Sequence, residues 1–275
     1  MWKKIALLLS ATVLLVSCQP KKPESQPAKK TKVEEAKSIP VDFLPRDLTV
    51  TALGDSLTEG IGDSTDTGGY LRYLEAEFEK EKGIENAVVN NFGKKGTRSD
   101  QLLNRLKNKE VVSAIEQSDM VLITIGGNDV MKVARQNILN MQYERFAKEK
   151  EFYSARLEKI MALIKKENPE AVIVLIGIYN PFLQWFPDVE ELDQIVSDWN
   201  EAGRSVIAQF PDAYFVNIDD IFTDLQVNLL FDDQFHPNDK GYQLIAERVY
   251  KTLGEEALPA VAGYTHAEGD KENRE

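Results

Sequence analysis

The stretch Thr49-Val50-Thr51-Ala52-Leu53-Gly54-Asp55-Ser56-Leu57 decides the fold. Its apolar and β-branched residues favour a buried β-strand, which stops at a glycine and is followed by Asp55 and Ser56. Open α/β sheets bind ligands at the carboxyl ends of their strands, so this serine marks a candidate site. A serine hydroxyl becomes a nucleophile only when a base takes its proton and hydrogen-bond donors receive the negative charge.

Short apolar runs alternate with amphipathic helical stretches along residues 46–256. The runs predicted as strands are 48–53, 87–92, 120–125, 171–178 and 213–218. The stretches predicted as helices are 70–82, 99–117, 153–167, 189–209 and 238–252. This order predicts an α/β fold, a three-layer α/β/α sandwich around a five-stranded, mostly parallel sheet.

Histidine is scarce, which narrows the search for a base. The two histidines are His236 and His266, and His266 lies in the polar C-terminal stretch. His236 precedes the last predicted helix and has Asp233 three residues before it. An aspartate at that spacing can accept a hydrogen bond from the imidazole and fix its tautomer, so the pair is a candidate base for Ser56.

Two glycine-containing loops follow the second and third predicted strands. The first, residues 91–99, contains Gly93 and Gly96, and the second contains Gly126, Gly127 and Asn128. Glycine lets a backbone N–H approach a substrate oxygen, and the asparagine amide offers a further donor. These loops are therefore candidates for an oxyanion hole.

Four blocks of the sequence resemble those of the SGNH hydrolase superfamily, the GDSL esterases and lipases. They are Gly54-Asp55-Ser56-Leu57, Gly96, Gly126-Gly127-Asn128-Asp129 and Asp233-Gln234-Phe235-His236. The blocks occur in the family's order, and the resemblance covers about residues 47–253. It implies a flavodoxin-like sheet and hydrolysis of ester bonds.

The resemblance also implies a role for each matched residue. Ser56 is expected to be the nucleophile, His236 the general base and Asp233 its orienting carboxylate. The Ser56 and Gly96 backbone N–H groups and the Asn128 side chain are expected to form the oxyanion hole. Gly93 is the alternative to Gly96 in its loop. Asp55 and Asp129 are interpreted as structural supports.

The N-terminal residues have the composition of an export signal and a tether. Residues 1–17 combine Lys3 and Lys4 with an apolar run that is too short to span a bilayer, which predicts a signal peptide. Cys18, the only cysteine, ends a Leu-Val-Ser-Cys sequence that resembles a bacterial lipobox. We therefore expect Cys18 to carry acyl chains such as palmitate, with residues 18–45 as a disordered linker. The alternative is an ordinary cleaved signal.

Charge separates the predicted catalytic body from its tether. The chain has 275 residues and a net charge of −12, and residues 1–45 carry +4, which leaves −16 for the remainder. An acidic body disfavours nucleic acid as a partner. The whole resembles the exported GDSL-type lipoproteins of Gram-positive bacteria, so we expect a monomer anchored at the outer face of the cell membrane. Residues 257–275 are interpreted as a disordered acidic tail.

Alternative kinds of site fit the sequence less well. Thr58 replaces the second glycine of the G-x-S-x-G elbow found in α/β-hydrolases. The glycines between Gly54 and Gly69 lack the G-K-[ST] of a phosphate-binding loop. A metal site on His236 with the aspartates at 219, 220, 232 and 233 would leave the serine unexplained, so we expect neither a metal nor a cofactor. A surface-tethered binding module is a further alternative, but no catalytic residue is missing.

The sequence does not identify the ester that is hydrolysed. Two segments, 131–152 and 179–187, leave from strand ends, and either they wall a substrate cleft or they pack among themselves. An acyl lipid or lysophospholipid is favoured by the aromatic residues at 182–186 and by the tether. Acetylated cell-wall carbohydrate and thioesters are the alternatives.

Overall fold

The computed structural model describes residues 45–137, 142–183, 189–224 and 226–258, and every structural statement below concerns these residues. All of them belong to the unit that spans Pro40–Glu275. The predicted signal peptide, Cys18, almost all of the predicted linker and the tail beyond residue 258 lie outside the described residues, so they remain predictions.

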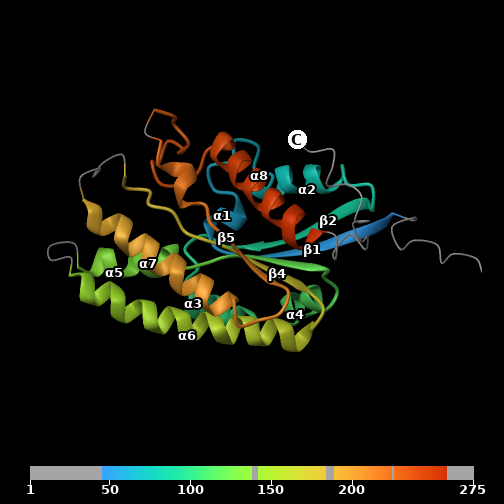
Figure 1. Cartoon of the computed structure of the whole chain (residues 1–275), viewed down its shortest axis with the longest axis horizontal. Coiled ribbons are helices and arrows are strands. Elements are labelled where there is room, and N and C mark those ends of the chain that lie inside the picture. Colours follow the sequence, from blue (N-terminus) through green and yellow to red (C-terminus); the bar gives the residue numbers. More distant parts are fainter. Residues whose placement is uncertain (1–44, 138–141, 184–188, 225, 259–275) are drawn as a thin grey trace, which may run out of the picture. The chain divides into compact units, whose positions relative to one another are not determined.

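The sheet has the predicted number of strands. They are β1 (Arg46–Gly54), β2 (Ile84–Gly93), β3 (Met120–Thr124), β4 (Val172–Ile176) and β5 (Ala213–Val216). Their order across the sheet is β2-β1-β3-β4-β5, and every pair is parallel (Figure 1). The central strands are buried along their length, as expected for a sheet covered on both faces.

Helices cover the two faces of this sheet (Figure 1). One face is covered by α2 (Tyr70–Phe78) and α8 (Asp239–Glu256). The other is covered by α3 (Ser99–Arg105), α4 (Lys109–Glu116), α5 (Gly127–Gln136), α6 (Tyr143–Glu167) and α7 (Glu190–Ile207). Strand residues alternate between the two cores: Val50 and Ala52 pack with α2 and α8, whereas Leu53 packs with the second group. The predicted three-layer α/β fold is thus confirmed.

The helix predicted over residues 99–117 is wrong as a single element. It is two helices, α3 and α4, separated at residues 106–108. The Asn108 side chain accepts a hydrogen bond from the backbone N–H of Glu110, which caps a new helix instead of continuing the old one. Apolar residues of α3 and α4 pack into the same core cluster. The spacing of apolar residues therefore continues across the break and does not reveal it.

Two further element boundaries differ from the sequence prediction. Helix α6 begins at Tyr143, ten residues before the predicted start, and α5 was not predicted as a separate helix. Two short helices, α1 (Ser56–Glu59) and a 3-10 turn at Asp219–Phe222, were also not predicted. The three unpredicted helices each follow directly after a strand.

The C-terminal boundary lies beyond the predicted residue 256. Ala257 and Leu258 are buried and belong to the same core cluster as α8. The folded body therefore includes these two residues, and the prediction that the tail begins at residue 257 is wrong by at least two residues.

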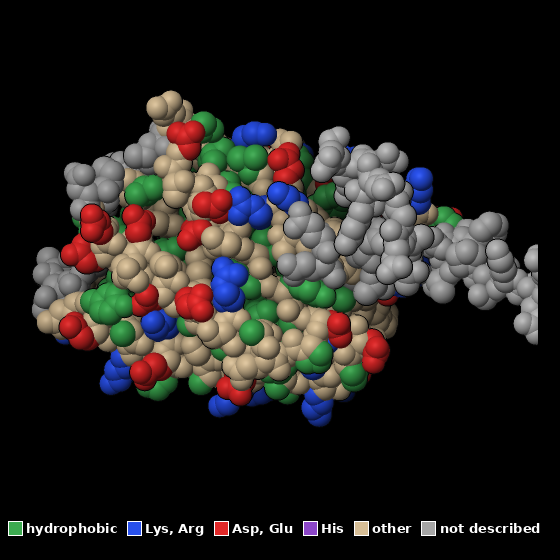
Figure 2. All heavy atoms as spheres, in the orientation of Figure 1, with side chains coloured by type: hydrophobic (Ala, Val, Ile, Leu, Met, Phe, Trp, Pro, Cys, Tyr) green, Lys and Arg blue, Asp and Glu red, His purple; other side chains and the backbone are tan. Residues whose placement is uncertain are grey.

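The described residues contain no helix that is long and apolar enough to cross a membrane. Figure 2 shows acidic and basic side chains interspersed over the visible face of the molecule. The distribution of charged side chains therefore does not identify a binding surface on this face. The candidate site is found instead at the carboxyl ends of the strands.

Candidate active site

The turn after β1 requires glycine at residue 54. Gly54 has φ = 151°, and a Cβ atom there would lie 2.3 Å from the carbonyl oxygen of Thr124 on β3. The next residue, Asp55, caps α1 by accepting a hydrogen bond from the Leu57 N–H at 3.1 Å. Ser56 is the first residue of α1, is only 3% exposed and lines a pocket.

The structure brings Ser56, His236 and Asp233 into one hydrogen-bonded chain. Ser56 Oγ lies 2.9 Å from His236 Nε2, and His236 Nδ1 lies 2.6 Å from Asp233 Oδ2. The backbone N–H groups of Phe235 and His236 both donate to Asp233 Oδ1 at 3.0 Å. Partial burial raises the pKa of Asp233, but these hydrogen bonds outweigh it and hold the pKa below its usual value. Asp233 is therefore a carboxylate that can orient the imidazole.

Tyr179 makes a contact with the histidine loop that the sequence did not reveal. Its hydroxyl donates to the backbone carbonyl of Phe235 at 2.6 Å, directly before His236. Its ring is buried and stacks on Phe222 with 4.0 Å between ring centroids. Phe182 meets the Phe235 ring edge-on at 6.2 Å. The segment after β4 thus positions the loop that carries the base.

The two glycines of the loop after β2 have different surroundings. A Cβ at Gly93 would lie 2.1 Å from the backbone nitrogen of Glu59, so Gly93 is needed where β2 packs against α1. Gly96 has φ = 78°, and a Cβ there would meet no atom within 4 Å. Gly96 is thus the glycine beside open space, which favours it over Gly93 as a donor to a substrate. The Lys94 N–H donates to the Gly54 carbonyl at 3.1 Å and ties this loop to β1.

Asn128 lies in the first turn of α5 and faces the same loop. Its Nδ2 donates to the Thr97 carbonyl at 3.2 Å, one residue after Gly96. An amide nitrogen carries two hydrogens, so this contact fixes the side chain while leaving a second donor. The structure therefore places the Gly96 loop, which follows β2, and Asn128, which follows β3, on the two sides of β1, whose carboxyl end carries Ser56.

A buried ionic cluster joins these two loops. Asp129 is 1% exposed and accepts hydrogen bonds from the backbone N–H of Ser99 at 2.9 Å and from its hydroxyl at 2.7 Å. Arg156 of α6 lies 3.3 Å from Asp129 and also binds Ser99 and Glu149. Burial raises the pKa of Asp129 despite these contacts. Asp129 supports its loop, in agreement with the sequence interpretation, but Arg156 was not predicted.

Asp55 is the second buried carboxyl group near Ser56. Thr124 Oγ1 donates to Asp55 Oδ1 at 2.9 Å, the same oxygen that caps α1. Burial raises the pKa of Asp55 to about 6, although the hydrogen bonds from Thr124 and Leu57 oppose this. Asp55 thus ties β1, α1 and β3 together as a structural support.

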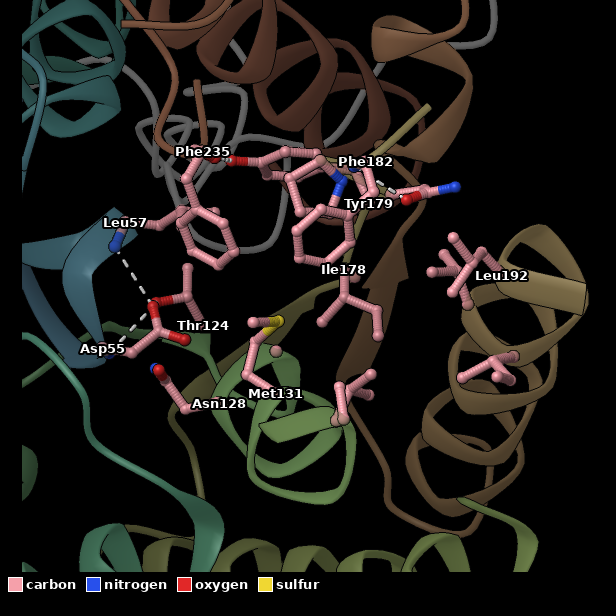
Figure 3. A pocket seen from close by; sticks show the side chains of 18 of the residues that line it. Asp55, Leu57, Thr124, Asn128, Met131, Ile178, Tyr179, Phe182, Leu192 and Phe235 are labelled. Carbon is pink, nitrogen blue, oxygen red and sulfur yellow. Dashed lines mark hydrogen bonds between the residues drawn. The ribbon is translucent and has the colours of Figure 1, made fainter. Parts of the chain in front are cut away.

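An apolar pocket opens beside Ser56 (Figure 3). Asp55 and Asn128 lie at one end, and Phe182 and Phe235 lie above it in this view. The side chains in the pocket beyond Asn128 are predominantly apolar and include Val130, Met131, Ala134, Phe146, Ile178, Leu192, Ile195 and Val196.

Both segments that were expected either to wall a cleft or to pack among themselves contribute to this pocket. Met131, Ala134 and Phe146 come from the first segment, and residues 179–182 come from the second. Residues 138–141 and 184–188 of these segments lie outside the described part of the chain. The contribution of α7, through Leu192, Ile195 and Val196, was not predicted, although their i, i+3, i+4 spacing marks one helix face.

Two of the four aspartates that were considered for a metal site are paired with a basic side chain in the structure. Asp220 forms an ion pair with Arg248 at 2.7 Å, and Asp233 binds His236. In the ranges that the structure describes, no group of three or more His, Cys, Asp or Glu side chains is arranged to hold a metal ion.

The chain matches the model of the GDSL-like Lipase/Acylhydrolase family over residues 52–244. The uncharacterized protein YpmR of Bacillus subtilis strain 168 is 36% identical over 256 residues, which cover 92% of this chain and 97% of YpmR. The spore germination lipase LipC of Bacillus licheniformis is 25% identical over 226 residues, which cover 81% of this chain and 99% of LipC.

Solved structures share the fold. The lipase Lip_vut3 from a goat rumen metagenome is similar with a TM-score of 0.68 and 22% identity, over 74% of this chain and 97% of Lip_vut3. Axe2, an acetyl-xylooligosaccharide esterase from Geobacillus, is similar with a TM-score of 0.57 and 21% identity, over 77% of this chain and 96% of Axe2. At these identities the similarity concerns the fold.

Proposed function

Because the chain belongs to the GDSL-like lipase/acylhydrolase family and is an ester-hydrolysing enzyme, we propose that it cleaves acyl lipid or lysophospholipid esters with Ser56 as nucleophile. The observation that carries the proposal is the hydrogen-bonded chain from Ser56 through His236 to Asp233. It opens onto an apolar pocket. The nucleophile, the general base, its orienting carboxylate and the oxyanion donors can then each be assigned to a residue.

In the first step, Ser56 Oγ attacks the ester carbonyl carbon while His236 Nε2 takes its proton. The 2.9 Å between these atoms is within the reach that general base catalysis requires. Asp233 holds the Nδ1 hydrogen, so Nε2 is the free base, and its negative charge stabilises the imidazolium that forms.

The carbonyl oxygen becomes an oxyanion in this step. We assign its donors to the backbone N–H groups of Ser56 and Gly96 and to the second Nδ2 hydrogen of Asn128. Fixed donors of this kind stabilise the developing charge because they need no reorganisation during the reaction. His236 then protonates the leaving alcohol, and a water molecule that His236 activates releases the acyl group from Ser56.

The lining of the pocket favours an acyl chain over a polar acyl group. Beyond Asn128 its side chains offer few hydrogen bonds to a sugar or a charged group, whereas a hydrocarbon chain gains by leaving water. The similarity to a protein named as a spore germination lipase agrees with this choice. Thioesters of the same acyl chains fit the same chemistry.

We also propose that the enzyme works at the outer face of the cell membrane. The proposal rests on residues 1–18, where an export signal is followed by the lipobox-like Leu-Val-Ser-Cys. Acyl chains on Cys18 would hold the enzyme beside membrane lipids, and residues 18–45 would serve as its linker.

The alternative is an O-acetylesterase for cell-wall carbohydrate. The fold similarity to an acetyl-xylooligosaccharide esterase favours it, and an acetyl group needs only the part of the pocket next to Ser56. The two candidates differ in acyl chain preference, which a series of p-nitrophenyl esters measures beside an acetylated glycan. A marked preference for acetate would replace the lipid proposal by this alternative.

Substitution of the proposed catalytic residues tests the mechanism. We expect Ser56→Ala and His236→Ala each to lower kcat by several orders of magnitude, since nucleophile and base act as a unit. His266→Ala is the matched control, because it removes the other histidine and should leave kcat unchanged. Thermal unfolding of each variant shows whether the fold is intact. Full turnover in folded Ser56→Ala protein would refute the mechanism.

A further inference from the structure

The apolar pocket extends away from the proposed catalytic residues. Figure 3 shows Asp55 and Asn128 at one end and Leu192 at the opposite end, with Met131 between them. A substrate whose carbonyl carbon lies at Ser56 must therefore extend its acyl chain from Asn128 past Met131 toward Leu192.

Helix α5 sets the length of this path. Its pocket-lining residues include Gly127, Met131 and Ala134, whose i, i+4, i+7 spacing places them along one helix face. An α-helix rises about 1.5 Å per residue, so Ala134, six positions after Asn128, lies about 9 Å further along the helix axis. A fully extended chain advances about 1.2 Å per bond, so about 9 Å accommodates about six to eight carbons of an acyl chain.

Side chains from three other elements limit the remaining space. Phe146 of α6 is 2% exposed and lines the same pocket, Leu192 comes from the first turn of α7, and Phe182 covers the pocket from above. Ala134 is the smallest side chain that α5 contributes beyond its first turn. Its methyl group leaves open the space that a larger residue would fill.

We propose that this pocket selects unbranched acyl chains of about six to eight carbons, and that Ala134 and Leu192 set the chain-length limit. The inference rests on the proposed function, because it takes Ser56 as the point where the acyl carbonyl is held. It identifies two specificity-determining residues that lie outside the hydrogen-bonded chain at Ser56 and outside the four family motifs.

Two substitutions with opposite effects test this proposal. Ala134→Phe adds a ring to the pocket lining about one helical turn beyond Met131, whereas Leu192→Ala enlarges the end at Leu192. Arg135→Phe is the matched control, because it adds the same ring to the next, exposed position of α5. The measurement is kcat/KM of the full chain for p-nitrophenyl esters of two to twelve carbons.

In the wild-type enzyme, kcat/KM should rise by about fourfold per methylene group up to about eight carbons and then level off. Ala134→Phe should lower the octanoate-to-acetate ratio at least tenfold, and Leu192→Ala should move the plateau to longer chains. Arg135→Phe should keep the wild-type profile. Ratios between substrates do not depend on the fraction of folded enzyme, so partial unfolding does not imitate the result.

The outcomes separate this inference from the proposed function. Unchanged ratios in Ala134→Phe and Leu192→Ala, with esters still hydrolysed through Ser56, would overturn the chain-length assignment alone. A wild-type profile that peaks at acetate would also overturn it. If wild-type and Ser56→Ala enzymes hydrolysed every ester equally, the proposed function itself would fail.

Discussion

Asp55 carries a carboxyl group that folding brings into a buried position beside Ser56. Its pKa is raised from 3.8 to about 6 because burial disfavours the charged form. Between these two values the folded protein binds more protons than the unfolded chain, so this group makes stability fall as pH rises from about 4 to about 6. Two pKa units correspond to about 3 kcal/mol of unfolding free energy.

Asp55→Asn tests this linkage. The amide oxygen can still accept hydrogen bonds from Leu57 and Thr124, but the side chain no longer ionises. The unfolding free energy of the variant, relative to wild type, should therefore increase by about 2–3 kcal/mol between pH 4 and pH 7. Urea denaturation at a series of pH values measures this difference. A difference that stays constant over this range would contradict the prediction.

The hydroxyl of Tyr179 offers a second prediction for a single residue. Tyr179→Phe keeps the stacking on Phe222 but removes the hydrogen bond to the Phe235 carbonyl. One such bond contributes about 1 kcal/mol, so we expect kcat to fall about fivefold with KM unchanged, because the loop that carries His236 is less well positioned. Tyr143→Phe is the control, because it removes a hydroxyl on α6 that donates to Asp198 of α7. A rise in KM at constant kcat would assign Tyr179 to substrate binding.

The proposed catalytic residues could be predicted from the sequence, whereas the residues that hold them in position could not. Ser56, Asp233 and His236 were predictable because each occupies a recognisable position, at a strand end or at i and i+3 in a loop. Tyr179 and Arg156 were not, because each acts through a contact with a residue at least 27 positions away. No local spacing records a contact of that kind.

Three helices meet at the charged cluster around Asp129. Ser99 begins α3, Asp129 lies in the first turn of α5, and Arg156 projects from the middle of α6. Because Asn128 precedes Asp129 and the Gly96 loop precedes Ser99, this cluster sets the positions of two proposed oxyanion donors. The cluster therefore acts on catalysis through the relative positions of α3, α5 and α6.

Arg156→Met tests the importance of this cluster. The change leaves Asp129 buried without its cationic partner. Because Arg156 itself is partly exposed, we expect the low end of the usual cost, about 3 kcal/mol of unfolding free energy, together with a lower kcat. Lys150→Met is the control on the same helix, since its ion pair with Asp198 is nearer the surface and should contribute less than about 1 kcal/mol. Chemical denaturation and ester turnover provide the two readouts. Equal losses in both variants would argue against a special role for Arg156.

Strands were easier to predict than helices for a physical reason. A strand covered on both faces is a continuous apolar run, as in β3 and β4, and such a run has clear ends. Helix limits depend on capping contacts instead. The break between α3 and α4 follows from the Asn108 side chain, and the start of α5 follows Gly126, which has φ = 118°. Apolar periodicity carries neither signal.

At the scale of the whole molecule, the proposed catalytic set comes entirely from the folded body. Its residues lie between Ser56 and His236 in the sequence, and the residues that line the pocket lie between Asp55 and Phe235. Residues 1–44 lie outside the described structure, and the role proposed for them is to place the enzyme at a membrane. The two roles are thus carried by different parts of the chain, so a substitution can separate them.

Cys18→Ser makes this separation measurable. Without the thiol, the chain cannot receive the acyl chains that the lipobox-like sequence predicts, so metabolic labelling with palmitate should be lost and the enzyme should leave the membrane fraction. Its kcat/KM for a soluble ester such as p-nitrophenyl butyrate should equal that of the wild type, because Cys18 is far in sequence from every proposed catalytic residue. Hydrolysis of lysophospholipid in vesicles should fall, since anchoring raises the local concentration of enzyme at the substrate. Unchanged palmitate labelling would contradict acylation at Cys18, and equal hydrolysis of vesicle lipid by the two proteins would show that the anchor does not serve substrate access.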